Sequence, residues 1–127
     1  MRDDREWLLD ILESIERIEK YSSRGRKTFE EDELIQSWIV HHLQIIGEAL
    51  RSISDGFRRE HNDIPWKETI GMRNILVHRY FDLDTDLVWK AVMRDLPDLK
   101  EKVRSALVED DKPSFRNLSL TLFQLSE

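Results

Sequence analysis

The chain contains no cysteine among its 127 residues, and it has only four glycines and three prolines. Without cysteine it can form no disulfide, no thiolate zinc site and no cysteine nucleophile. It also lacks an apolar run long enough to cross a bilayer, and its charged N-terminus, MRDDREW, does not resemble a signal peptide. These absences predict a soluble cytoplasmic protein, and the length is enough for one domain with its own core.

The formal net charge of −6 argues against a surface that binds nucleic acid non-specifically all over. The charge is nevertheless uneven along the chain. Residues 51–80 carry six basic and four acidic side chains, a net charge of +2, whereas the remainder carries 14 basic and 22 acidic ones, a net charge of −8. A short basic cluster on a helix is most often a solvated face, so the excess alone assigns no function.

Helical spacing of apolar residues dominates the first half of the chain. The first stripe ends at Ser22, and residues 24–27 form a short basic loop. Thr28, followed three residues later by Glu31, has the pattern of a capping box and predicts that a second, long helix begins there. The positions expected on the apolar faces are Leu8, Ile11, Leu12, Ile15 and Ile18, then Leu34, Ile35, Trp38, Ile39, His42, Leu43, Ile46, Ala49, Leu50 and Ile53.

The second half of the chain predicts further helices separated by a clear loop. Asp55-Gly56 either ends the long helix or lies near its frayed end, and the loop at 61–65 leads through Pro65 into a third helix. Asp84 or Thr85 would cap a fourth helix, in which Pro97 predicts a kink or a break near Leu96. The apolar positions are Trp66, Ile70, Ile75 and Leu76 in the third helix, and Leu87, Val88, Ala91, Val92, Leu99, Val103 and Leu107 after it.

No strand-like alternation competes with these helices before the tail. The predicted fold is therefore all-α, an antiparallel bundle of four to five helices over residues 1–109. Residues 110–127 form a C-terminal extension in which Leu118, Leu120, Leu122 and Phe123 nearly alternate with polar residues. A docked segment, a strand-like arm and disorder all fit this tail.

Several common sites are excluded by their missing residues. Asp82, Asp84 and Asp86 suggest a calcium loop, but Leu87 replaces its glycine and Met93 its final glutamate, so they favour a helix cap. No histidine belongs to a Glu-x-x-His pair of a di-iron bundle.

Adjacent His41 and His42 converge poorly on a metal; His42 shares the apolar stripe, which predicts a core histidine. Phosphate-binding glycine loops and the serine nucleophile motif are also absent, and the four tryptophans fit core positions better than base stacking. No metal and no cofactor are expected.

Residues 73–82, RNILVHRYFD, concentrate reactive side chains. Arg73 and His78 are five residues apart, about 140° around a helix, so they do not share a face. His78 and Tyr80 lie on one side only of an extended segment. A joint site therefore requires either a helix that ends close to His78 or a second subunit that completes the site.

Two neighbours of these residues are also informative. Asn74 precedes His78 by four residues and shares its helical face, so its amide could fix the tautomer of the imidazole. Gly71 costs about 1 kcal/mol relative to alanine inside a helix, which is explicable if another backbone approaches there.

These residue types support metal-free RNA cleavage. A histidine can take a proton from a ribose 2′-hydroxyl or give one to the 5′-leaving oxygen. A guanidinium beside it can stabilise the charge of the phosphorane-like transition state. Spacing alone favours a plainer interpretation, in which Arg73 forms a surface salt bridge and His78 ends a helix.

The stretches GMRNILVHRYFDLDTDLVW and DLPDLK resemble the signature of HepT-like proteins within the HEPN superfamily, and IIGEAL and IPW upstream are similar to that family as well. The resemblance covers residues 4–108. Arg73, His78 and Tyr80 meet the family pattern R-x4-H-x-Y, and Asn74 matches the polar residue that commonly follows the arginine.

The resemblance implies the toxin of a prokaryotic type VII-like toxin–antitoxin system, a metal-independent endoribonuclease of RNA, with transfer RNA a reasonable substrate. It implies a homodimer that brings the motifs of both protomers together, with Arg73 and His78 catalytic and Asn74 supporting. The partner it implies is a minimal nucleotidyltransferase antitoxin, which transfers AMP to Tyr80.

Two other functions fit the residues. The chain could be a non-catalytic helical subunit that binds a nucleotide or presents substrate to a nucleotidyltransferase. It could also be a purely structural bundle that oligomerises through Gly71 and the third helix.

Overall fold

The computed structural model describes residues 2–66 and 84–111 of the chain. The helices in these ranges are α1 (Asp4–Ser22), α2 (Arg26–Glu31), α3 (Glu33–Ser52), α4 (Asp55–Glu60), α6 (Thr85–Lys90), the π-helical turn η1 (Ala91–Asp95) and α7 (Leu96–Asp111). The described residues contain no β-strand. The prediction of an all-α fold is confirmed.

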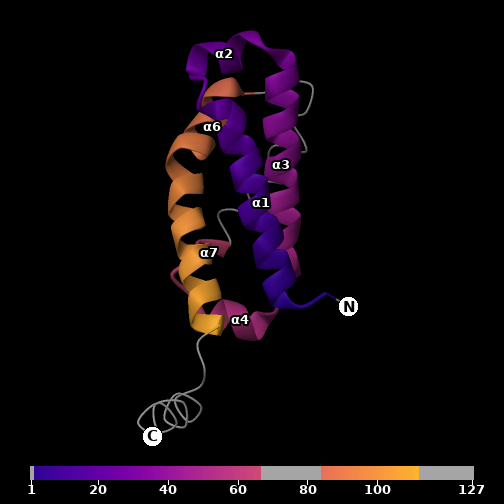
Figure 1. Ribbon diagram of the computed structural model, residues 1–127, viewed down its shortest axis with the longest axis vertical. Helices are drawn as coiled ribbons and strands as arrows, with labels where there is room; N and C mark the ends of the chain where they lie inside the picture. The colour runs from indigo at the N-terminus through magenta and orange to yellow at the C-terminus, as the bar shows by residue number, and fades with distance from the viewer. Residues whose placement is uncertain (1, 67–83, 112–127) are drawn as a thin grey trace, which may run out of the picture.

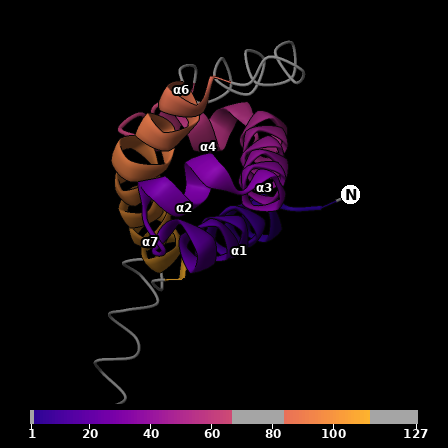
Figure 2. The ribbon, with the colours of Figure 1, turned by 90° about the horizontal axis from the view of Figure 1, so that it is seen from above.

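Helix α1 is the centre of the packing, because it contacts α3 along one side and α7 along the other. Figure 1 shows α1 running in the opposite direction to both α3 and α7, and Figure 2 shows the three helices grouped around a common interior. The short helices α2 and α6 lie at one end of this bundle, and α4 lies at the other. The antiparallel arrangement also agrees with the prediction.

The core is built from the apolar stripes that the sequence predicts. Fully buried side chains come from all three long helices and from α2 and α6, and four tryptophans (Trp7, Trp38, Trp66 and Trp89) pack partly buried against them. Leu34 is the exception, because its side chain is 82% exposed while Ile35 beside it is buried. The buried set is Leu8, Ile11, Ile15, Ile18, Phe29, Ile35, Ile39, Val40, Leu43, Ile46, Ala49, Leu50, Ile53, Phe57, Ile64, Val88, Val92, Leu96, Leu99, Val103, Ala106 and Leu107.

The predicted start of the long helix at Thr28 is wrong. Gly25 has a φ of 98°, a left-handed conformation that glycine adopts readily, and the chain turns there directly into α2. Thr28 lies inside α2, where its hydroxyl donates to the Arg24 carbonyl. Helix α3 begins instead after Asp32, whose Oδ1 accepts from the amides of Leu34 (2.9 Å) and Ile35 (3.3 Å).

The chain does not follow either alternative at Asp55-Gly56. Helix α3 ends at Ser52, and both residues belong to a new helix, α4. The Ser54 hydroxyl accepts from the Phe57 amide, and the same hydroxyl donates to Asp4 Oδ2 at 2.6 Å. Ser54 therefore caps α4 and also ties it to the beginning of α1.

Pro97 distorts its helix without breaking it. Helical structure continues from Thr85 to Asp111, and the turn just before Leu96 is π-helical, with the Leu96 amide bonded to the Ala91 carbonyl. Proline has no amide hydrogen to donate to the preceding turn, and its ring crowds the backbone there, so a widened turn accommodates it. The irregularity near Leu96 is therefore a π turn, and the predicted break does not occur.

His42 is the core histidine that the sequence predicts. Its side chain is buried, and its Nδ1 lies 2.8 Å from the Trp38 carbonyl. Because a carbonyl only accepts, Nδ1 carries the hydrogen and the neutral ring is satisfied at this atom. Burial lowers the pKa of His42, since it disfavours the charged ring more than the carbonyl bond favours it.

Replacing His42 by glutamine is expected to remove part of the pH dependence of folding. The lowered pKa of His42 means that the unfolded chain binds the proton more readily than the native one, so this contribution is complete above the ordinary pKa of 6.5 and is lost as the pH falls below it. Urea unfolding at pH values on both sides of 6.5 measures the effect. An equal loss of stability on acidification in both proteins would contradict it.

Candidate functional site

The motif residues Arg73, Asn74, His78 and Tyr80 lie outside the described residues, as do Gly71 and Asp82. Their predicted roles therefore stay predictions. The predicted C-terminal extension lies outside the described residues as well, apart from its first two residues, which continue the backbone of α7. The structure describes the two points between which the motif lies in the chain, Trp66 before it and Asp84 after it.

Trp66 is held at the α4 end of the bundle by contacts on several sides. Its Nε1 donates to the His61 carbonyl at 3.0 Å, and its ring meets Phe57 edge to face with centroids 6.2 Å apart. The His61 ring stacks on the Phe57 ring with centroids 4.2 Å apart. Ile64, which lies between His61 and Trp66 in the sequence, is buried. The predicted loop at 61–65 is confirmed, and its contacts fix the position of Trp66.

Arg58 belongs to the stretch with a net positive charge, but it serves the fold. Its Nη2 donates to the carbonyls of Leu50 (2.9 Å) and Arg51 (2.8 Å) in the last turn of α3. The Leu50 carbonyl also accepts from the Ile53 amide at 3.4 Å, and the helix dipole favours a cation beside these last carbonyls. The guanidinium also lies 5.9 Å from the Trp66 ring centroid. Arg58 therefore caps the C-terminal end of α3 and contacts the Trp66 ring.

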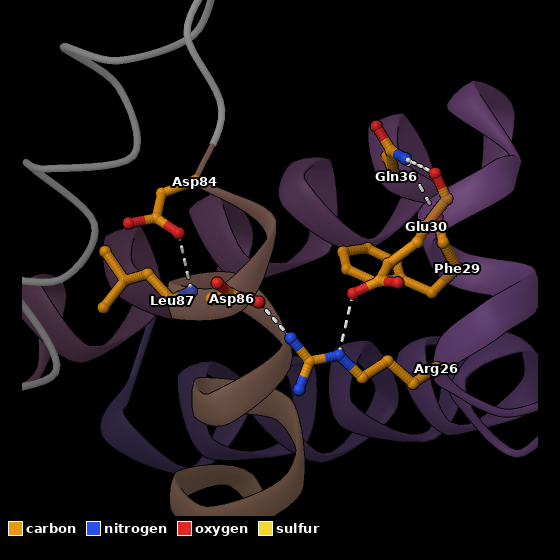
Figure 3. A network of polar contacts seen from close by, with 7 residues as sticks. All are labelled: Arg26, Phe29, Glu30, Gln36, Asp84, Asp86 and Leu87. Carbon is orange, nitrogen blue, oxygen red and sulfur yellow. Dashed lines mark hydrogen bonds and ion pairs between the residues drawn. The ribbon is translucent and has the colours of Figure 1, made fainter.

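Asp84 marks the other point and acts as a helix cap, as predicted. Its Oδ1 accepts from the Leu87 amide at 3.1 Å and so begins α6. Two residues later Asp86 pairs with Arg26 of α2, whose Nε also donates to Glu30 at 2.8 Å. Figure 3 shows Arg26 between these two carboxylates. The chain therefore begins α6 beside α2.

Helix α2 is itself fixed to the core around this contact. Gln36 of α3 donates from Nε2 to the carbonyls of Phe29 (2.9 Å) and Glu30 (3.1 Å) at the end of α2. The buried Phe29 ring stacks on Trp89 of α6 with centroids 5.4 Å apart. Sequence spacing did not reveal this arrangement, because Arg26 and Asp86 are 60 residues apart.

No group of three or more histidine, aspartate or glutamate side chains that could hold a metal ion occurs at residues 2–66 or 84–111. The rings of His41 and His42 lie edge to face with centroids 5.1 Å apart. Within the same ranges no helix is both long and apolar enough to cross a membrane.

Comparison with known proteins identifies relatives over most of the chain. Residues 11–106 match the model of a family described as "Ribonuclease HepT-like", and this range includes the whole motif. A protein named "Probable ribonuclease HepT" from Thermococcus cleftensis is 40% identical over 104 residues, which cover 80% of this chain and 93% of the relative. A protein named "Putative RNase" from Methanocaldococcus jannaschii is 40% identical over 103 residues, 80% of this chain and 94% of its own.

A longer relative contains the same region, and its name gives two functions. It is named "Gamma-glutamylcyclotransferase and putative RNase", comes from Methanocaldococcus jannaschii, and is 39% identical over 112 residues. This alignment covers 87% of the present chain but only 50% of the relative. No solved structure matches the chain. The family match and these identities show that the chain belongs to the HepT-like ribonuclease family of the HEPN superfamily.

Proposed function

We propose that the protein is a metal-independent endoribonuclease and the toxin of a type VII-like toxin–antitoxin pair. The observation that carries this proposal is an intact R-x4-H-x-Y motif inside the region that matches a ribonuclease family. The chain on either side of the motif is anchored, by Trp66 against α4 and by Asp86 against α2. Such anchoring supports a site of defined geometry.

The chemistry requires no metal ion. The ribose 2′-hydroxyl loses its proton and attacks the adjacent phosphorus, and the bond from phosphorus to the 5′-oxygen breaks as that oxygen gains a proton. The products are a 2′,3′-cyclic phosphate and a 5′-hydroxyl. His78 transfers a proton, and the Arg73 guanidinium stabilises the charge that builds on the phosphoryl oxygens. Asn74 orients the imidazole of His78.

A homodimer supplies the geometry that one helix lacks. On one continuous helix Arg73 and His78 would point about 140° apart and would not meet at one phosphate, so in this proposal a second protomer completes the site. Two protomers with their motifs facing each other bring an arginine and a histidine together across the interface. The site is therefore composite in this proposal.

A minimal nucleotidyltransferase antitoxin silences the toxin by modifying Tyr80. The phenolic oxygen attacks the α-phosphorus of ATP, a tyrosine–AMP phosphodiester forms, and pyrophosphate leaves. Each AMP adds a negative charge and a bulky base beside Arg73 and His78. The added group competes with RNA for the same positive charges and blocks the site sterically.

The wild-type protein is expected to cleave RNA in excess EDTA. The measurement uses purified protein, total bacterial RNA as substrate, and mapping of the product ends for a cyclic phosphate and a 5′-hydroxyl. An intact mass spectrum of the same sample shows whether AMP is attached. Protein of unmodified mass that binds RNA without cleaving it would contradict the proposal and would support the non-catalytic binding subunit.

A further inference from the structure

The end of the bundle that holds α2 carries positive charges that the described part of the chain does not neutralise. Lys20, Arg24 and Lys27 are exposed, and none of them pairs with a carboxylate among residues 2–66 and 84–111. Of the neighbouring carboxylates, Glu19 pairs with Lys100 and Glu30 with Arg26, each at 2.8 Å, while the exposed Glu31 and Glu33 lie at the other end of α2, where it is followed by α3. The basic surface is therefore confined to the junction of α1 and α2, and it is made of these three cations.

An aromatic ring orders two of these cations. The Lys20 Nζ lies 5.6 Å and the Arg24 Cζ 4.9 Å from the centroid of the Tyr21 ring. The ring is itself fixed, because it meets Trp38 edge to face at 5.5 Å, and Trp38 Nε1 donates to the Arg17 carbonyl at 2.9 Å. Ordered cations lose less conformational entropy when they bind an anion. Basic surfaces with aromatic side chains are typical of proteins that bind single-stranded nucleic acid.

This basic surface lies at the end of the bundle where the motif segment rejoins the described chain. Arg26, between Arg24 and Lys27 in sequence, pairs with Asp86 in the first turn of α6. Figure 1 shows α2 and α6 at the same end of the bundle, away from α4. His78 precedes Asp84 by six residues, and six residues of chain span at most about 20 Å.

A strand of RNA can bridge that separation. Single-stranded sites on proteins cover roughly 4–16 nucleotides, so RNA that is cleaved at His78 extends beyond the reacting phosphate on at least one side. At the opposite end of the bundle the exposed Arg51 and Arg59 are not held against an aromatic ring of the described residues, and Arg58 donates to the carbonyls of Leu50 and Arg51. Its charge already stabilises the end of α3.

We infer that Lys20, Arg24 and Lys27 bind the phosphates of single-stranded RNA flanking the cleaved bond, with Tyr21 holding Lys20 and Arg24 in place. This inference rests on the proposed ribonuclease function and adds a binding surface to it. The three side chains lie outside the R-x4-H-x-Y motif. They contribute to the affinity for RNA and not to the proton transfers at the reacting phosphate.

Replacing Arg24 and Lys27 together by glutamine is expected to weaken RNA binding and its salt dependence. In a His78→Ala background, fluorescence anisotropy with a labelled single-stranded RNA should show a Kd raised about tenfold. The slope of log K against log salt should become shallower by about 1.4, because each lost phosphate contact on a single strand contributes roughly 0.7. In the otherwise wild-type protein most of the effect should appear in KM rather than in kcat.

The matched control removes the same two charges elsewhere. Lys102 and Arg104 lie on α7, where they pair with Asp98 and Glu16, and replacing both by glutamine should leave Kd and the salt slope unchanged. An equal loss in this control would overturn the inference by pointing to net charge alone. Unchanged binding by the Arg24/Lys27 variant of a protein that cleaves RNA would overturn the inference and leave the proposed function standing. A wild-type protein that neither binds nor cleaves RNA would overturn both.

Discussion

Replacing His78 by alanine is expected to abolish RNA cleavage and toxicity while the helical fold remains. A positioned general acid or base contributes about 10²–10⁴-fold to a rate, and a dimer of the variant lacks this group in both of its sites. Initial cleavage rates in excess EDTA, and growth after expression without an antitoxin, measure the two effects. Mapping the product ends distinguishes specific cleavage from a contaminating nuclease.

The control for this experiment removes a different histidine. His41 is exposed on α3 and is not part of the motif sequence, so His41→Ala makes the same chemical change at another histidine. It should keep wild-type cleavage, and both variants should keep the helical circular dichroism of the wild type. A His78→Ala protein that cleaves at the wild-type rate would contradict the assignment of this residue.

Helical periodicity predicted the bundle correctly because burial follows the spacing of apolar residues. Helix α1 ends at Ser22, where the apolar stripe ends, and Leu99, Val103 and Leu107 are buried on α7 as expected. The same pattern failed at Leu34, which is next to the buried Ile35 in the first turn of α3. In this first turn Leu34 lies on the edge of the apolar stripe and faces solvent.

Helix starts were harder to predict than helix faces, because several residues in one stretch can act as caps. Two N-caps fit the sequence here, Thr28 (paired with Glu31) and Asp32. The left-handed turn at Gly25 decides between them. The chain begins α2 at this turn, before Thr28, which leaves Asp32 to cap α3. The π turn before Pro97 has a local cause, yet the sequence did not choose between a kink and a break.

The chemistry of the candidate site stays a prediction, whereas the structure describes the chain on both sides of the motif. The types of Arg73, His78 and Tyr80 indicated proton transfer and charge stabilisation, although their spacing alone favoured a plainer interpretation and the resemblance to the family decided between the two. The contact between Arg26 and Asp86 joins residues 60 apart, and no periodic pattern connects them. The same contact places the start of α6, where the motif segment rejoins the described chain, beside residue 26 of α2.

Replacing Tyr80 by phenylalanine is expected to free the toxin from its antitoxin. Phenylalanine has no hydroxyl to attack ATP, so the variant should stay unmodified when a nucleotidyltransferase antitoxin is present and should still arrest growth. Its ring occupies nearly the same space as tyrosine, so RNA cleavage without the antitoxin should persist. Co-expression followed by intact mass spectrometry and growth measurement checks both results.

The chain supplies the matched control, because Tyr21 is its one other tyrosine. Tyr21→Phe keeps the ring that packs on Trp38 and should still receive AMP and be neutralised. If the Tyr80→Phe variant still receives AMP and the Tyr21→Phe variant receives none, Tyr21 is the acceptor. If Tyr80→Phe is unmodified but still neutralised, the antitoxin acts by binding alone. Either result would reject AMP transfer to Tyr80 as the means of control. Neither result would contradict RNA cleavage by the free toxin.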